Sequence, residues 1–79
     1  MQRLFPRSID ALAMIAHFVD EFIAANRLGQ GASFSVNLVI EELFTNMVKY
    51  SSGGAEEISV QLESRDDRIV LQMIDYDVE

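Results

Sequence analysis

The chain has 79 residues with a formal net charge of −7, no cysteine and one histidine. A chain of this length forms at most one small domain, and the absence of cysteine excludes a disulfide framework and a cysteine-built metal site. The acidic balance argues against direct binding to nucleic acid, which needs clustered lysine and arginine. Its surface either keeps the domain soluble or matches a basic partner.

The first predicted elements are a short strand and a helix. Residues 1–5 alternate weakly and stop at Pro6, which is typical of an edge strand. Ser8 is predicted to cap a helix that runs to about Arg27. Apolar residues then repeat at helical spacing, which predicts a buried stripe. This stripe consists of Leu12, Ile15, Ala16, Val19, Phe22 and Ile23.

Two apolar residues of this helix lie off the stripe. Met14 and Phe18 are four residues apart and project roughly 120–160° around the helix from it. They either pack on a neighbouring element or form a surface for a partner or a homodimer. His17 lies on the polar side of the helix, where we expect it to be solvated.

Gly29 and Gly31 are predicted to end the first helix and to form the turn that follows. A second helix is predicted from about Ser33 or Ser35 to Tyr50. Its expected core line consists of Val36, Ile40, Leu43 and Met47, widened by Val39 and Phe44.

Two strands are predicted in the remaining sequence. Residues 57–63 alternate, residues 64–68 form a polar turn, and residues 69–76 form the next strand. The last strand is apolar on both faces apart from Gln72, which favours a position inside the sheet. The faces expected to meet the helices carry Ile58, Val60 and Leu62 on one strand and Ile69, Leu71 and Met73 on the other.

The order strand, helix, helix, strand, strand predicts a single α+β domain over residues 1–79. We expect a two-layer α/β sandwich with the helices on one face of a mostly antiparallel sheet. Apolar residues are patterned and never form a run of ~18, which argues against a signal peptide or a membrane span. A cytoplasmic protein is therefore expected.

The second predicted helix carries the residues best suited to chemistry. Glu42 and Asn46 are four residues apart on one ridge, and Lys49 follows three residues later. A carboxylate and an amide one turn apart suit a hard cation and the orientation of a nucleophile. The same pair also occurs by chance on solvated helix faces. Glu41 points about 100° away and is the weaker candidate acid.

Asp75 ends the last predicted strand. Alternation places it on the same face as Ile69, Leu71 and Met73, at the mouth of the helix–sheet layer. A buried carboxylate needs an internal donor or a ligand, whereas a carboxylate at a frayed strand end is simply solvated.

Three segments together resemble a known family. Residues 4–22, residues 40–46 (IEELFTN) and residues 70–75 (VLQMID) resemble the N-terminal part of the Bergerat-fold, or GHKL, ATPase domain. Among these ATPases the anti-sigma factor serine kinases are the most similar. Residues 46–51 are also similar to the corresponding segment of sensor histidine kinases.

The resemblance implies a role for each site residue. Asn46 would ligate the Mg²⁺ of bound ATP or ADP, and Glu42 would be the general base that accepts a proton from a serine hydroxyl. Asp75 would accept the adenine amino group, and Lys49 and Tyr50 would lie near the phosphates and the base. The implied partners are a sigma factor and an antagonist protein that carries the phosphorylated serine.

The sequence departs from the family pattern after the aspartate. Asp77 and Glu79 stand where glycines are expected, so they add bulk and negative charge near a polyphosphate. The likeness covers only the N-terminal part of such a domain, so we expect the domain to be incomplete. The alternative function is therefore a non-catalytic interaction or dimerisation module of the same fold. A third interpretation is the ATP-binding part of a histidine kinase.

Overall fold

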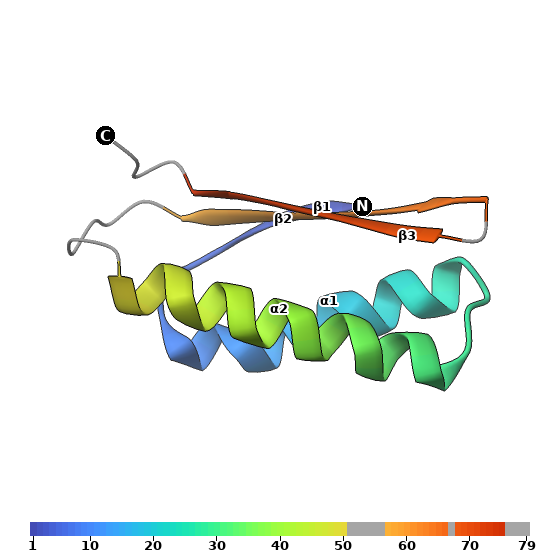
Figure 1. Ribbon diagram of the computed structural model, residues 1–79, viewed down its shortest axis with the longest axis horizontal. Helices are drawn as coiled ribbons and strands as arrows, with labels where there is room; N and C mark the ends of the chain where they lie inside the picture. The colour runs from blue at the N-terminus through green and yellow to red at the C-terminus, as the bar shows by residue number, and fades with distance from the viewer. Residues whose placement is uncertain (51–56, 67, 76–79) are drawn as a thin grey trace.

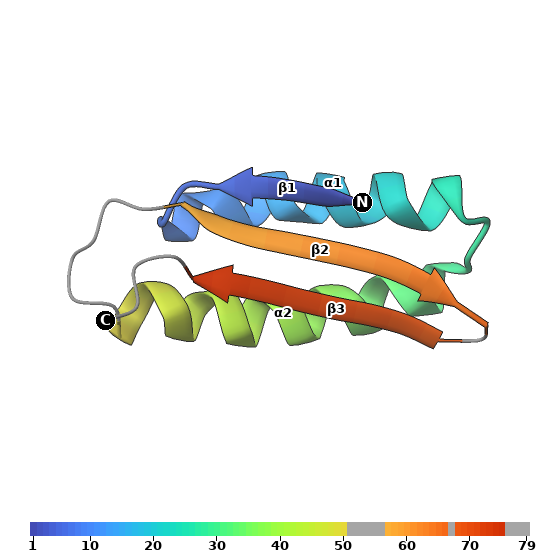
Figure 2. The ribbon, with the colours of Figure 1, turned by 90° about the horizontal axis from the view of Figure 1, so that it is seen from above.

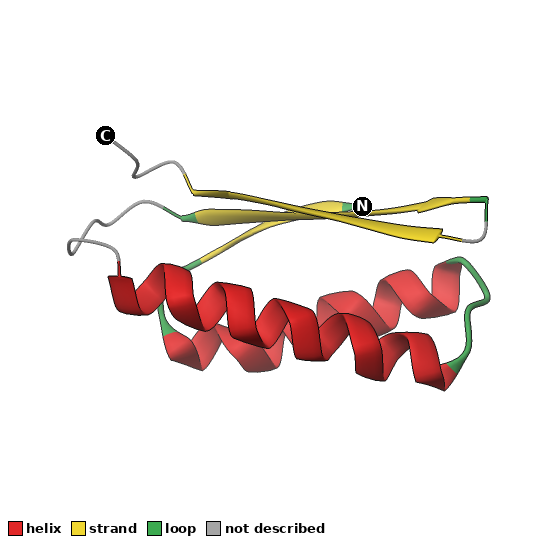
Figure 3. Ribbon diagram, viewed as in Figure 1, coloured by secondary structure: helices red, strands yellow, loops and turns green. Residues whose placement is uncertain are grey.

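The computed structural model describes residues 1–50, 57–66 and 68–75, and these residues form two layers, a three-stranded sheet above two helices (Figures 1 and 3). This arrangement confirms the predicted α+β sandwich. The elements in chain order are β1 (Gln2–Phe5), a 3₁₀ turn (Ile9–Ala11), α1 (Leu12–Ala25), α2 (Gln30–Tyr50), β2 (Ile58–Arg65) and β3 (Arg68–Asp75).

The sheet is antiparallel throughout and has the order β1-β2-β3. Within the described residues, the predicted edge position of β1 is confirmed and the predicted internal position of β3 is wrong, since β3 pairs only with β2. The apolar residues on both faces of β3 misled that prediction. One face packs on the helices, whereas Val70 on the other face is 41% exposed. Figure 2 shows β1 above α1 and β3 above α2, with β2 between them.

Each helix is bounded by local backbone chemistry. The Ser8 hydroxyl accepts a hydrogen bond from the Asp10 N–H at 3.2 Å, which confirms the predicted cap. The chain leaves α1 through Arg27, which has a φ of 56°, so arginine takes the left-handed position predicted for a glycine. Because the Ala32 N–H donates to the Gly29 carbonyl at 3.0 Å, α2 begins earlier than predicted and includes Gly31.

The hairpin between β2 and β3 is tighter than predicted. Arg65 pairs directly with Arg68, so only two residues connect the strands. Asp66 has a φ of 52°, and aspartate tolerates this left-handed conformation better than most residues. The predicted polar turn over residues 64–68 is therefore too long, because β2 stays paired with β3 up to Arg65.

The core lies between the sheet and the two helices. The predicted alternation of β2 is confirmed, since Ile58, Val60 and Leu62 are fully buried. The helix-facing residues of β3 pack against this core as predicted, namely Ile69, Leu71 and Met73. The α1 stripe is also confirmed, with Ile15, Val19, Phe22 and Ile23 buried.

Phe18 and Met14 have different environments, although both lie off the predicted stripe. Phe18 is 1% exposed, and its ring meets that of Phe5 edge-on at a centroid distance of 5.6 Å. The Arg3 guanidinium lies 5.1 Å from the centroid of the Phe18 ring. Met14 is 47% exposed. Phe18 therefore packs on a neighbouring element, and it cannot form a partner surface with Met14.

The apolar face of α2 is rotated from the predicted one. Ile40 and Phe44 are buried as predicted, but Val39 is 48% and Leu43 is 43% exposed. Ser33 is buried instead, and its hydroxyl donates to Asp20 Oδ1 of α1 at 2.9 Å. The helix turns this side inward because it must contact both α1 and the sheet, which the spacing of its apolar residues does not specify.

The buried position of Phe18 gives a stability prediction. Phe18→Ala should lower the free energy of unfolding by about 3–5 kcal/mol, because it leaves a cavity beside Phe5. Urea denaturation followed by circular dichroism measures this loss. Met14→Ala is the control and should change stability by less than about 0.5 kcal/mol. Equal losses for the two variants would contradict the assignment.

Candidate functional site

The candidate site lies on the exposed side of α2. Glu42 and Asn46, one helical turn apart, are both exposed to solvent. They border a hollow of about 470 Å³ on the helix surface. This hollow is lined by five α2 residues, namely Leu38, Glu41, Glu42, Thr45 and Asn46.

The two predicted polar groups have no partner among the residues that the structure describes. In the described ranges, no residue forms a hydrogen bond or ion pair with the side chain of Glu42 or Asn46. Asn37, a polar residue on the inner side of α2, does have a partner, since its amide donates to the Ser33 carbonyl at 3.0 Å. The outer pair is therefore open to a ligand, and it sits on a helix whose opposite face is held by the core.

Three residues of the hollow were missed or ranked low from the sequence. Leu38, Glu41 and Thr45 recur at helical spacing on the same side of α2, and Glu41 borders the same hollow as Glu42. The signal that could have found them is the spacing of three and four residues. It was missed because Leu38, which is 52% exposed, is apolar and carries no polar group that would mark a site.

Positive charge gathers at the C-terminal end of α2. Lys49 lies exposed in the last turn of the helix and has a polar partner. Arg7, which was not predicted, donates from Nη1 to the Met47 carbonyl at 3.5 Å. Cations stabilise the negative end of a helix dipole, and the same charges lie one turn from Asn46. The side chain of Tyr50 lies outside the described residues.

Asp75 reaches the same end of the molecule. Its backbone pairs with Ile58, and the C-terminal ends of β3 and α2 lie at the same end of the two layers (Figures 1 and 2). The structure thus places this strand end and the last turns of α2 at the same end of the molecule. The Asp75 side chain, Asp77 and Glu79 fall outside the described residues.

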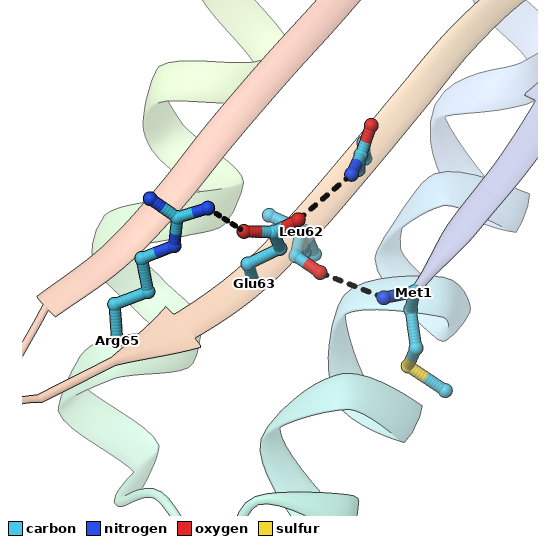
Figure 4. Close-up of polar contacts among 5 residues, drawn as sticks. Met1, Leu62, Glu63 and Arg65 are labelled. Atoms are coloured by element: carbon cyan, nitrogen blue, oxygen red, sulfur yellow. Dashed lines mark hydrogen bonds and ion pairs between the residues drawn. The ribbon is translucent and has the colours of Figure 1, made fainter.

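A second polar cluster, on the outer face of the sheet, is self-contained. Glu63 accepts a hydrogen bond from Gln61 Nε2 at 2.9 Å and pairs with Arg65 at 3.1 Å (Figure 4). Nearby, the Met1 amine donates to the Leu62 carbonyl at 2.8 Å and holds β1 to β2. These groups satisfy one another, so this cluster supports the sheet and does not compete with α2 as a candidate site.

The residues of the candidate site suit a metal ion that arrives bound to a ligand, and not one held by protein side chains alone. Across 1–50, 57–66 and 68–75 the structure holds no group of three or more histidine or acidic side chains that could bind a metal ion. Magnesium is often held by one or two protein oxygens, with nucleotide phosphates and water completing its shell. The exposed oxygens of Asn46 and Glu42 suit that arrangement.

Comparison with protein families identifies the family to which the chain belongs. The family model of the histidine kinase-like ATPase domain matches residues 5–79. The chain therefore belongs to this family, and nucleotide binding is the general property the family suggests. Comparisons with curated proteins and with solved structures give no match. Among the described residues, no helix is long and apolar enough to cross a membrane.

The exposure of the site residues predicts that they can be replaced without loss of the fold. Glu42→Ala and Asn46→Ala should each change the free energy of unfolding by less than about 0.5 kcal/mol. Phe44→Ala, on the buried side of the same helix, should cost about 3–5 kcal/mol. Thermal unfolding followed by circular dichroism compares the three variants. A large loss for Asn46→Ala would show that its amide has a structural role.

Proposed function

We propose that the exposed side of α2 and the end of β3 bind a magnesium–nucleotide complex. One observation carries this proposal. A carboxylate and an amide that have no partner among the described residues lie one turn apart beside a hollow of about 470 Å³, in a chain of an ATPase family. Solvated residues would occur on such a face by chance, but the family match makes a ligand role the better explanation.

Each residue has a defined task in this proposal. Asn46 holds the magnesium ion, and Lys49 and Tyr50 lie beside the phosphates and the base. Asp75 accepts a hydrogen bond from the adenine amino group. The bound magnesium supplies charge neutralisation of the phosphates. Arg7, anchored on the Met47 carbonyl, adds positive charge near the same end of α2.

The proposed reaction is phosphorylation of a protein serine. Glu42 accepts the proton of the serine hydroxyl, and the exposed position of this carboxylate leaves room for a protein substrate. Phosphoryl transfer depends mainly on positioning and electrostatic stabilisation, so a sparse set of residues suits it. By likeness to anti-sigma factor kinases, the substrate is an antagonist protein and the regulated partner is a sigma factor in the cytoplasm.

A second candidate function is a non-catalytic interaction or dimerisation module. The specific observation in its favour is apolar exposure beside the hollow, where Phe34 is 72% and Leu38 is 52% exposed. The acidic residues Asp77 and Glu79, which replace expected glycines, also disfavour a bound polyphosphate. In this case the fold would remain while nucleotide binding is lost.

Calorimetric titration with magnesium and ATP or ADP tests the first proposal. Asn46→Ala should weaken nucleotide binding at least about tenfold, which corresponds to ~1.4 kcal/mol, because it removes the metal ligand. Glu42→Gln should retain binding within about threefold and abolish phosphoryl transfer, because it removes only the base. Gln72→Ala, an exposed amide on β3, is the matched control and should leave binding unchanged.

The same titration separates the two candidate functions. Absence of measurable heat at millimolar nucleotide would overturn nucleotide binding for this chain and favour the interaction module. Equal affinity of the wild-type chain and Asn46→Ala would overturn the assigned metal ligand while leaving nucleotide binding intact.

The role of Asp75 gives a test of base recognition. Asp75→Asn should reduce the preference for ATP over GTP by about tenfold, because an amide can also donate a hydrogen bond to a guanine oxygen. Competition between the two nucleotides measures this ratio. Asp66→Asn, which removes a carboxylate from the hairpin, is the control and should leave the ratio unchanged. An unchanged ratio for Asp75→Asn would contradict adenine recognition by this residue.

A further inference from the structure

We propose that Arg7 is a positioning residue of the nucleotide site, which acts through the last turn of α2 on Lys49. This role rests on the proposed function, because Lys49 is assigned to the phosphates there. Lys49 needs such a residue, because a lysine ammonium is a point charge on a flexible stem of four carbons. The contact of Arg7 with the backbone of α2 supplies it.

The backbone on both sides of Arg7 is fixed. Phe5, two residues before it, is 2% exposed and pairs with Ile58 in the sheet. The Ser8 N–H, directly after it, donates to the Pro6 carbonyl at 2.8 Å, and the Ser8 hydroxyl caps the turn that follows. The half-buried Arg7 side chain therefore leaves the backbone at a defined place between β1 and α1.

The segment that carries Arg7 packs beside the C-terminal end of α2. The 3₁₀ turn Ile9–Ala11 is in contact with α2, and Ala11 has no exposed surface. Figures 1 and 2 show the start of α1 and the end of α2 at the same end of the helical layer. From this segment, Arg7 Nη1 donates to the Met47 carbonyl at 3.5 Å. At this length the charge matters more than the hydrogen bond, and a cation is favourable at the negative end of a helix dipole.

Arg7 and Lys49 act on opposite sides of the same turn. Met47 packs against the core, so Arg7 reaches the backbone of this turn from the inner side of α2. At 100° per residue, Lys49 projects about 160° from Met47 and about 60° from Asn46. Lys49 is exposed, on the side of the helix that carries Asn46. Arg7 thus holds the turn, and Lys49 faces the ligand from it.

Positive charge is scarce in this chain, and these two residues carry it where the nucleotide would bind. The formal net charge is −7, which repels a polyphosphate. The chain has six lysine and arginine residues, and all of them lie in the described ranges. The other four either pair with a carboxylate or lie at the opposite end of the molecule, namely Arg3, Arg27, Arg65 and Arg68. A defined position of Lys49 therefore matters more than it would in a basic protein.

Amide hydrogen exchange tests the positioning role without nucleotide. In Arg7→Ala, the backbone N–H groups of residues 47–49 should exchange at least about fivefold faster than in the wild-type chain, because the last turn frays. Those of residues 39–42, in the middle of α2, should be unchanged. Arg7→Lys keeps a cation at the helix end and should restore most of the protection. Arg68→Ala removes an arginine at the opposite end and is the matched control, with no change expected.

Two outcomes of the exchange measurement would overturn the assignment. Unchanged exchange at residues 47–49 in Arg7→Ala would show that Arg7 does not hold the turn. Faster exchange throughout the chain would show that Arg7 supports the whole fold and not this turn in particular.

A double-mutant cycle, measured by calorimetric titration with magnesium and ADP, tests the link to Lys49. Arg7→Ala and Lys49→Ala should each weaken binding about tenfold. The double variant should be no more than about twofold weaker than Lys49→Ala, because both changes remove the same interaction. Arg7→Lys should bind within about threefold of the wild-type chain, and Arg68→Ala should match it.

The cycle also separates this role from the nucleotide site itself. Losses that multiply in the double variant, or an unchanged affinity of Arg7→Ala, would overturn the role of Arg7 and leave the nucleotide site intact. Absence of ADP binding by the wild-type chain would overturn the proposed function, and the role of Arg7 with it.

Discussion

The burial of one face of β2 against both helices is the constraint on which the rest of the structure depends. Ile58, Val60 and Leu62 have no exposed surface, and they lie in the only strand that pairs on both sides within the described chain. These side chains join the N-terminal strand, the C-terminal strand and the helical layer into one core. Because a small domain buries a limited fraction of its surface, few other contacts can replace this one.

This constraint holds α2 by one side and leaves its other side exposed. Ile40 and Phe44 anchor its inner side, so the helix is held in place without any contribution from Glu42 or Asn46. A rigid element that displays unpaired polar groups can position a ligand more accurately than a loop can. The same rigidity leaves Val39 and Leu43 exposed.

Local chemistry explains which features could be predicted from the sequence. The Ser8 cap and the alternation of β2 depend on neighbouring residues only, and both are confirmed. The rotation of α2 and the edge position of β3 depend on contacts between distant segments, so Leu43 and the internal position of β3 were predicted wrongly. The Glu42–Asn46 ridge was found by its spacing. Arg7 was not, because its contact with Met47 joins residues 40 positions apart.

That contact also links the candidate site to the sheet. Arg7 lies two residues after the end of β1, and β1 is fixed by its pairing with β2, from Phe5 opposite Ile58 to Gln2 opposite Gln61. Its guanidinium donates to the carbonyl of Met47. Met47 directly follows Asn46 and lies in the helical turn that leads to Lys49. Because β2 pairs with β1 on one side and with β3 on the other, this contact also fixes the turn relative to the end of β3. Any ligand that spans Asn46 and Asp75 would bridge two elements whose spacing the core has already fixed, which lowers the entropy that binding must overcome.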